Sequence, residues 1–210
     1  DAVLSEEEIA EVSKIEVEKR KIKELTGIEH FKYLGYLKCY GNELTSLDLS
    51  KNTLLETVLC QENQLQSLNV SNAAEMTMLR CNNNQLLNLD VSMNTALTSL
   101  NCGSNQLTTL DVSKNTKLTD LSCSGNQLTT LHLKRNTELH TLECHYNQLT
   151  SLDVTYNTAL TRLNCNSNQL TSLDVSNCAV LDFLNCSDNK LTSLDVSKNT
   201  ALTYLDCSYN

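Results

Sequence analysis

The chain has 210 residues, a formal net charge of −9 at pH 7 and a pI near 4.9. This acidic balance argues against a nucleic-acid partner or an anionic membrane surface, since both require a basic face, and no apolar run approaches the roughly 20 residues of a membrane-spanning helix. Aromatic residues make up only 4% of the chain and proline is absent, so the turns must rely on Asn, Asp, Ser and Thr side chains that bond to nearby backbone.

Residues 1–11 are predicted to form a short helix that caps the N-terminal end of the domain. Ser5 followed three places later by Glu8 is a capping box, a pattern typical of helix N-termini. We expect the helix to run to about Val12 and to cover the open end of the core that follows.

The same segment, DAVLSEEE, also resembles the second half of an EF-hand calcium loop. On that alignment the side-chain ligands would be Asp1, Ser5 and Glu8, and Val3 would supply a carbonyl oxygen. The first two ligand positions would lie before Asp1, and Ala2 stands where the loop requires glycine. The capping helix is therefore the favoured interpretation, and a calcium loop completed by upstream residues is the alternative.

From residue 12 to residue 210 the chain follows one repeat, which predicts a single solenoid domain. Nine cysteines recur every 21 residues from Cys39 to Cys207, and nine asparagines follow three places later, from Asn42 to Asn210. A fixed period of this length is typical of a solenoid, in which each repeat is one coil stacked on the last. Residues 12–33 are predicted to be a degenerate first coil of 22 residues, and its inward side chains are Ile15, Val17, Ile22 and Leu25.

Residues 97–117, LTSLNCGSNQLTTLDVSKNTK, serve as the reference coil, numbered here as places 1 to 21 from Leu97. Places 4 and 6 are both apolar, which is the alternation of a strand with one buried face. A buried Asn at place 9 can bond to the backbone of its own coil and of a neighbour, so the nine asparagines predict a ladder of amide bonds. Places 11 to 19 repeat the pattern of places 1 to 9. The opposite wall is therefore predicted to be extended or 3₁₀, because eleven residues cannot hold an α-helix with both its connections.

The motif LxxLxCxxNxL resembles the leucine-rich repeat, with Cys in the third Leu position, over about residues 12–210. The unit LTxLxCxxNQLTxLDVSxNTx is similar to the 21-residue cysteine-ladder repeats of internalins and related bacterial surface proteins, and TGIEHFKYL near the start resembles an internalin repeat. The resemblance implies a right-handed leucine-rich-repeat solenoid, mainly β, with a parallel sheet on the concave wall and short extended or 3₁₀ segments opposite. It also implies a secreted or cell-surface bacterial protein with a role in recognition or adhesion.

The cysteines admit three interpretations: disulfides, metal or Fe–S ligation, and small apolar core residues. In-register neighbours about 4.8 Å apart keep their Cβ atoms beyond the roughly 3.5 to 4.5 Å that a disulfide prefers. There is no CxxC motif, and thiols in a line facing a leucine core are poorly placed for a metal or a cluster. We therefore favour the third interpretation, in which Cys fills a narrow inward slot. Cys178 replaces the Asn of place 19 and is expected to be partly exposed.

Places 3, 5, 7 and 8 vary between coils, and we expect any partner to bind there, on the outward face of the strands. An apolar and basic N-terminal zone comprises Tyr36, Tyr40, Leu59, Met78 and Arg80. A polar middle zone comprises Asp120, His140, Glu143, His145, Tyr146 and Arg162. A far zone comprises Phe183, Tyr204 and Tyr209. Exposed aromatic residues and Arg are typical of interfaces; the alternative is drift at places that the fold does not constrain. A zinc site at His140, Glu143 and His145 is disfavoured because no fourth ligand is evident.

The opposite wall carries a column of carboxylates at place 15, comprising Asp48, Asp90, Asp111, Asp153, Asp174 and Asp195. Asn69 and His132 interrupt this column. We expect each carboxylate to accept bonds from the backbone of its own turn, with help at the surface from the cations at place 18, such as Lys51, Lys114 and Lys198. Calcium bound between coils is the alternative.

The internalin resemblance therefore implies an extracellular module that binds a protein or glycan ligand, and we expect no cofactor, metal or nucleic acid. The alternative is a structural spacer of a larger bacterial surface protein without its own ligand. No Ser-His-Asp or phosphate-loop pattern supports an enzyme. The last coil stops at place 9, so we expect Leu202, Leu205 and Cys207 to be covered by a continuing chain or by end-to-end packing against another molecule.

Overall fold

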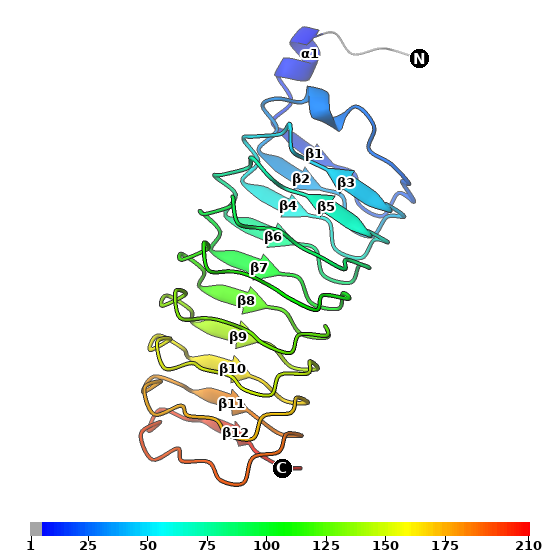
Figure 1. The fold of residues 1–210 in the computed structure, drawn as a ribbon. Coiled ribbons are helices and arrows are strands. Elements are labelled where there is room, and N and C mark those ends of the chain that lie inside the picture. The colour runs from blue at the N-terminus through cyan, green and yellow to red at the C-terminus, as the bar shows by residue number, and fades with distance from the viewer. Residues whose placement is uncertain (1–5) are drawn as a thin grey trace.

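The computed structural model describes residues 6–210, which form an elongated solenoid with the first helix at one end and the C-terminus at the other (Figure 1). Helix α1 spans Glu6–Ala10, and one 3₁₀ turn, η1, spans Ile28–His30. The expected cap helix is thus present and ends two residues earlier than predicted. Asp1, Val3 and Ser5, on which the capping box and the calcium loop depend, lie outside the described residues.

Ten three-residue strands form one parallel sheet along the solenoid, in the order β1-β2-β4-β6-β7-β8-β9-β10-β11-β12 (Figure 1). These strands are β1 (Lys14–Glu16), β2 (Tyr36–Lys38), β4 (Thr57–Leu59), β6 (Met78–Arg80), β7 (Ser99–Asn101), β8 (Asp120–Ser122), β9 (Thr141–Glu143), β10 (Arg162–Asn164), β11 (Phe183–Asn185) and β12 (Tyr204–Asp206). Pairing is in register at 21 residues, as between Leu142 and Leu163. The pair Ile15 and Leu37 is 22 residues apart, because the first coil is one residue longer.

The opposite wall is extended. Two strands, β3 (Ser46–Asp48) and β5 (Ser67–Asn69), pair in parallel there, and in the later described coils the same places have no regular ladder and no helix. The prediction of short extended segments in place of α-helices is confirmed. The core between the walls consists of the inward places of the coils. On the strand side these are fully buried, from Leu37 and Cys39 to Leu184 and Cys186, whereas Leu110 on the opposite wall is 8% exposed and Leu68 is partly buried.

The predicted asparagine ladder at place 9 is confirmed. Asn84 shows its geometry: Nδ2 donates to the carbonyl oxygens of Cys60 (3.1 Å) and Cys81 (2.9 Å), and Oδ1 accepts the backbone N–H of Leu65 (3.0 Å). Each amide therefore joins its own coil to the preceding one. Because the side chain satisfies backbone groups that a turn would leave buried and unpaired, no other residue type of similar size can replace it.

A second ladder of asparagine side chains runs along place 19, and the sequence had not led us to predict it. Asn115 Nδ2 donates to the carbonyl oxygens of Val91 and Asn94 in the preceding coil, both at 2.9 Å. Cys178 occupies the same slot, with Sγ 3.8 Å from the Val154 oxygen and 3.7 Å from the Asn157 oxygen. The expectation that Cys178 is partly exposed was wrong: it is fully buried, because place 19 faces the core and the thiol stands in for an amide donor.

All ten cysteines are free thiols, and nine of them are buried. Burial raises the pKa of Cys39 and of Cys102 to about 12 and that of Cys178 to about 11. The buried thiols therefore stay protonated at neutral pH and act as small apolar side chains, as the third interpretation proposed. Cys207, in the last coil, is exposed.

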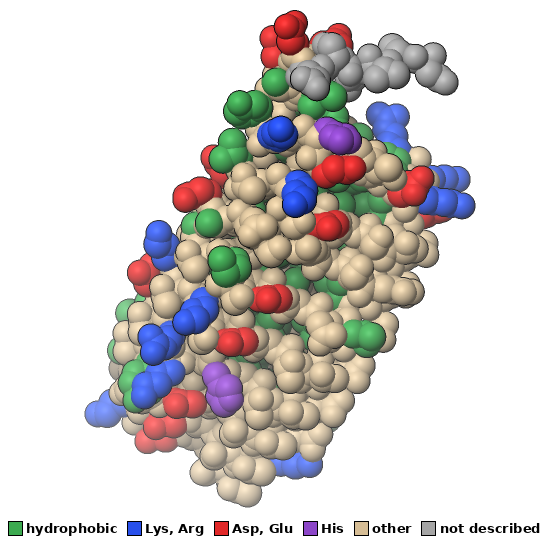
Figure 2. All heavy atoms as spheres, turned by 45° about the horizontal axis from the view of Figure 1, so that its top comes forward, with side chains coloured by type: hydrophobic (Ala, Val, Ile, Leu, Met, Phe, Trp, Pro, Cys, Tyr) green, Lys and Arg blue, Asp and Glu red, His purple; other side chains and the backbone are tan. Residues whose placement is uncertain are grey.

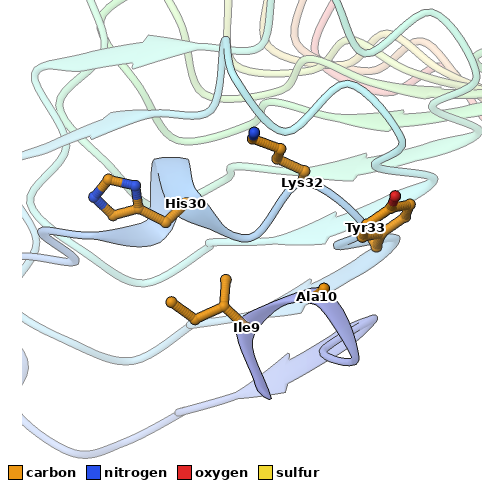
Figure 3. Close-up of a pocket in the computed structure, with 5 residues that line it drawn as sticks. All are labelled: Ile9, Ala10, His30, Lys32 and Tyr33. Carbon is orange, nitrogen blue, oxygen red and sulfur yellow. The ribbon is translucent and has the colours of Figure 1, made fainter. Parts of the chain in front are cut away.

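At the N-terminal end, α1 and the turn around η1 leave a hollow of about 340 Å³ (Figure 3). Ile9 and Ala10 line it from the helix side, and His30, Lys32 and Tyr33 line it from the first coil. The helix thus lies at the N-terminal end of the solenoid and beside this hollow (Figure 1).

Candidate ligand-binding surface

The outward side chains of the ten-stranded sheet form rows along the solenoid, because each strand pairs with the next in register. The middle residue of each strand from β2 to β11 is buried, while the two flanking residues face outward. A ligand that approaches this face therefore meets places 3 and 5 of every coil, with place 7 at the edge. The repeat fixes the spacing of these rows, but the residue types in them vary from coil to coil.

Place 8 differs from the other variable places, because its backbone is left-handed in all nine coils. Gly41 and Gly125 have φ of 67° and 62°, and the remaining seven residues are not glycine, among them Tyr146 at 52°. An L-residue in this conformation is held there by the surrounding turn. The turn points the ring of Tyr146 away from the core, where it is 62% exposed.

The two tyrosines of the N-terminal zone are already in contact with nearby lysines. Lys14 Nζ lies 5.1 Å from the ring centre of Tyr36, and Lys38 Nζ lies 5.6 Å from that of Tyr40. Lys38 also contacts Glu18 at 3.0 Å, and its hydrogen bond lowers the pKa of Glu18. Leu59 and Met78 are half-buried beside this network. Arg80 is exposed and has no ion pair among the described residues, so it is the cation of this zone that a partner can engage.

A hollow of about 600 Å³ lies on the strand face between the N-terminal and middle zones. Met78 and Arg80 border it on one side and Thr141 and Glu143 on the other. Its floor consists of short side chains from β7 and β8, namely Ser99, Asn101 and Ser122. The sequence prediction missed the hollow because it sought large side chains. The available signal was the run of small residues at places 3, 5 and 7 of these two coils.

Beyond the hollow, the middle and far zones form one connected array, whereas the sequence suggested two patches. Glu143 accepts a bond from Arg162 Nε at 2.7 Å and lies 3.3 Å from His145 Nδ1. The Arg162 guanidinium stacks on Phe183, 3.7 Å from the ring centre, and Phe183 stacks on Tyr204 with ring centres 4.4 Å apart and planes within 4°. Four coils are thus linked through their outward side chains.

Glu143 is the carboxylate at the centre of this array, and its charge state decides how the array is held together. Its burial alone would raise the pKa, but the nearby side chains of His145, Arg162 and Asn164, of which Arg162 donates a hydrogen bond, outweigh that effect and hold the pKa at about 2. The carboxylate is therefore charged at any physiological pH and fixes the side chain of Arg162.

The remaining predicted residues lie at the margin of this array or outside it. His145 and Tyr146 meet edge to face, with ring centres 5.4 Å apart. Asp120, on the hollow's border, accepts a bond from the neighbouring Thr119 hydroxyl at 2.8 Å. His140 is exposed just before β9, and Tyr209, 86% exposed, has no ring contact among the described residues.

Residues 6–210 contain no cluster of three or more His, Cys, Asp or Glu side chains that could hold a metal ion. The place-15 carboxylates are engaged locally: Asp111 Oδ1 accepts the backbone N–H of Ser113 at 2.8 Å, and Asp195 does the same with Ser197. These bonds lower the pKa of both aspartates, with a smaller contribution from Lys114 and Lys198. The predicted local compensation of the acidic column is confirmed.

The fold and its ladders define a leucine-rich-repeat solenoid of the cysteine-ladder, internalin-like type, and the chain is a protein of that type. It is similar to the functional domain of InlJ from Listeria monocytogenes, a domain that includes a cysteine ladder, with 39% identity and a TM-score of 0.79 over 97% of this chain. The chain spans about half of that structure, 50% of its length. No family model and no curated protein matches the chain.

Two more distant structures share the fold. Internalin InlF from Listeria monocytogenes is 21% identical, with a TM-score of 0.65 over 96% of this chain and 75% of its own. The effector YopM from Yersinia pestis is 22% identical, with a TM-score of 0.74 over 84% of this chain and 49% of its own. Such a solenoid, with a core fixed by the repeat and a variable strand face, is in general a protein-interaction module. In the described part of the chain no helix is long and apolar enough to cross a membrane.

Proposed function

We propose that this chain is a recognition or adhesion module of a secreted or cell-surface bacterial protein, and that it binds a protein ligand on the strand face. The observation that carries the proposal is the array from Glu143 through Arg162 and Phe183 to Tyr204, next to a hollow of about 600 Å³. It occupies places that vary between coils, whereas the places that build the core are nearly constant.

The array supports binding because its side chains are held before a ligand arrives. Arg162 is fixed on one side by Glu143 and on the other by Phe183. A preorganised Arg or aromatic side chain loses less conformational entropy on binding, and such residues dominate the energetics of protein interfaces. The hollow beside it can receive a projecting side chain, with Arg80 on its far border.

A protein ligand fits this surface better than a glycan. Glycans stack on open aromatic faces, but one face of Phe183 is covered by Arg162 and the other by Tyr204. A catalytic function has no support among the similar solved structures, which are leucine-rich-repeat and internalin proteins. We accordingly propose a binding function without catalysis or cofactor.

The test is an array of host and bacterial surface proteins, with a glycan array beside it, probed with the wild-type chain and with the double variant Arg162→Ala, Phe183→Ala. We expect a protein ligand whose affinity falls at least about tenfold in the variant, as for loss of a central interface anchor. Lys198→Ala, on the opposite wall, should bind normally. Equal binding by all three chains, or binding to glycans alone, would refute the proposal.

The second candidate is a spacer without a ligand, and one observation favours it. Many outward side chains satisfy each other across coils, as Lys38, Tyr40 and Glu18 do, so they stabilise the stack without any partner. In that case the Arg162→Ala, Phe183→Ala variant lowers the melting temperature, and no arrayed protein or glycan binds the wild-type chain.

A further inference from the structure

The turn after the opposite wall carries a second row of outward side chains, which the strand-face function does not use. We call Met93, Lys114, Arg135 and Tyr156 the place-18 row, since they occupy that place in four successive coils. The neighbouring place 19 shows that they stack in register: Asn115 Nδ2 bonds to the Asn94 oxygen at 2.9 Å, and Asn157 Nδ2 bonds to the Asn136 oxygen at 2.8 Å. All four side chains are exposed, Met93 to 55% and Tyr156 to 44%.

In this region the sequence departs from the usual residues of the repeat. The usual sequence of places 15 to 19 is D-V-S-x-N, whereas the coil of residues 118–138 has H-L-K-R-N there. His132 thus replaces an aspartate, and Lys134 replaces a serine or threonine. Both exchanges lie on one wall of this single coil, which therefore lacks the local Asx turn that the aspartates of other coils form.

The result is a group of cations without ion pairs on an otherwise acidic chain. Among the described residues, no carboxylate lies within ion-pair distance of Lys114, Lys117, Lys134 or Arg135. The nearest carboxylates of the wall are held by their own turns, since Asp111 accepts the Ser113 N–H at 2.8 Å and Asp153 accepts the Thr155 N–H at 2.9 Å. Lys134 lies over the ring of Tyr156, 5.1 Å from its centre.

A hollow of about 380 Å³ adjoins the row, lined by residues that include Thr109, Asp111, Thr130 and His132. Figure 2 shows acidic side chains in a line with a histidine among them, and basic side chains gathered beside this line along one edge.

We propose that the place-18 row is a second docking surface, on the wall opposite the strand face, for an extended acidic segment of a protein partner. Two adjacent cations between an exposed Met and an exposed Tyr match a segment with central Asp or Glu residues and an apolar residue at each end. Three inter-coil steps of about 4.8 Å span about 14 Å, which about four or five residues of extended peptide cover. The apolar ends favour a peptide over a uniformly charged polyanion.

The test is a displayed library of random seven-residue peptides, selected on the wild-type chain and on the variant Lys114→Glu, Arg135→Glu. We expect the wild type to enrich peptides with acidic centres and apolar flanks, and we expect their affinity to fall at least about tenfold in the variant. The variant Lys51→Glu, Lys198→Glu makes the same charge change at place 18 of distant coils and should bind these peptides normally. Because the four positions are exposed, all variants should fold, which circular dichroism checks.

Three outcomes would overturn the proposal: no enrichment, enrichment of peptides without acidic residues, or equal binding by the Lys114→Glu, Arg135→Glu variant. A polyanion site is distinguished with heparin and with the variant Met93→Ser, Tyr156→Ser. If this variant loses peptide binding, the apolar ends act as proposed; if it binds peptide and heparin as the wild type does, the surface is merely basic. The outcome is independent of the strand face, because Arg162 and Phe183 are unchanged.

Discussion

At the scale of single residues, the side chain at each inward place of the coil is selected by the space available and by the backbone groups that need a hydrogen-bond partner. Place 6 takes a small apolar thiol, place 9 takes an amide, and place 19 takes an amide or, once each, Cys178 and Ala73. Asn126 illustrates the demand: Nδ2 donates to the oxygens of Cys102 and Cys123, and Oδ1 accepts the N–H of Leu107.

Thiol reactivity checks the structural role of the cysteines. In the folded 210-residue chain we expect one thiol, Cys207, to react with a disulfide reagent at pH 8, because it alone is exposed. The other nine should react only on unfolding, since burial keeps them as thiols and out of reach. Reaction of several thiols at the rate of a free thiol in native conditions would contradict the core assignment.

Replacement of Asn126 by Ala tests the place-9 ladder. The change leaves two carbonyl oxygens and one N–H without their partner in a buried turn, and we expect a loss of about 2–4 kcal/mol in the free energy of unfolding. Asn115→Cys is the matched control at place 19, where Cys178 already serves, and it should cost less than half as much. Urea denaturation measures both, and equal costs would show that the two ladders do not differ.

At the scale of elements, each strand has only three residues and is stabilised by pairing with the strands of the adjacent coils. The repeat predicted each strand, its register and its buried middle residue, because these follow from side chains that recur in every coil. It could not predict the array of Glu143, Arg162, Phe183 and Tyr204, since contacts between coils depend on side-chain torsions that single residues do not encode. The exposure predicted for Cys178 failed because the second ladder becomes visible only from the backbone carbonyls it bonds to.

The array predicts a pH dependence that Glu143→Gln should remove. The folded pKa of Glu143, about 2, lies below its ordinary value of 4.5, so its stabilisation is complete above pH 4.5 and is lost as the pH falls toward 2. We expect Glu143→Gln to be less stable than the wild type at pH 7, with the gap closing between pH 4.5 and 2. Glu75→Gln, at an exposed turn, is the control. A constant gap across this range would show that Glu143 does not hold the array.

At the scale of the whole molecule, the solenoid is one-dimensional: each coil contacts its neighbours, and stability is close to a sum over coils and their interfaces. The fold class could be read from the sequence because one period governs the entire chain. The surfaces could be read only in part, because they consist of the residues that the period does not determine.

Leu121→Ala tests this neighbour-by-neighbour coupling. Leu121 is 1% exposed in the middle of the stack, and its truncation should cost about 2–5 kcal/mol. Hydrogen exchange followed by mass spectrometry should show faster exchange in its own and adjacent coils than in the coils near β2 and β11. Uniform acceleration along the chain would instead indicate a single cooperative unit.

The central claim is that constant places hold the fold while the strand face of the later coils binds the protein ligand. A scan of all substitutions in a surface-displayed chain, sorted once for display and once for binding of a ligand found on the protein array, tests it directly. Changes at places 1, 4, 6, 9, 11 and 14 should reduce display and binding together, whereas changes at Arg162, Phe183 and the border of the 600 Å³ hollow should reduce binding alone. Binding-specific losses scattered over all walls, or confined to the opposite wall, would contradict the account.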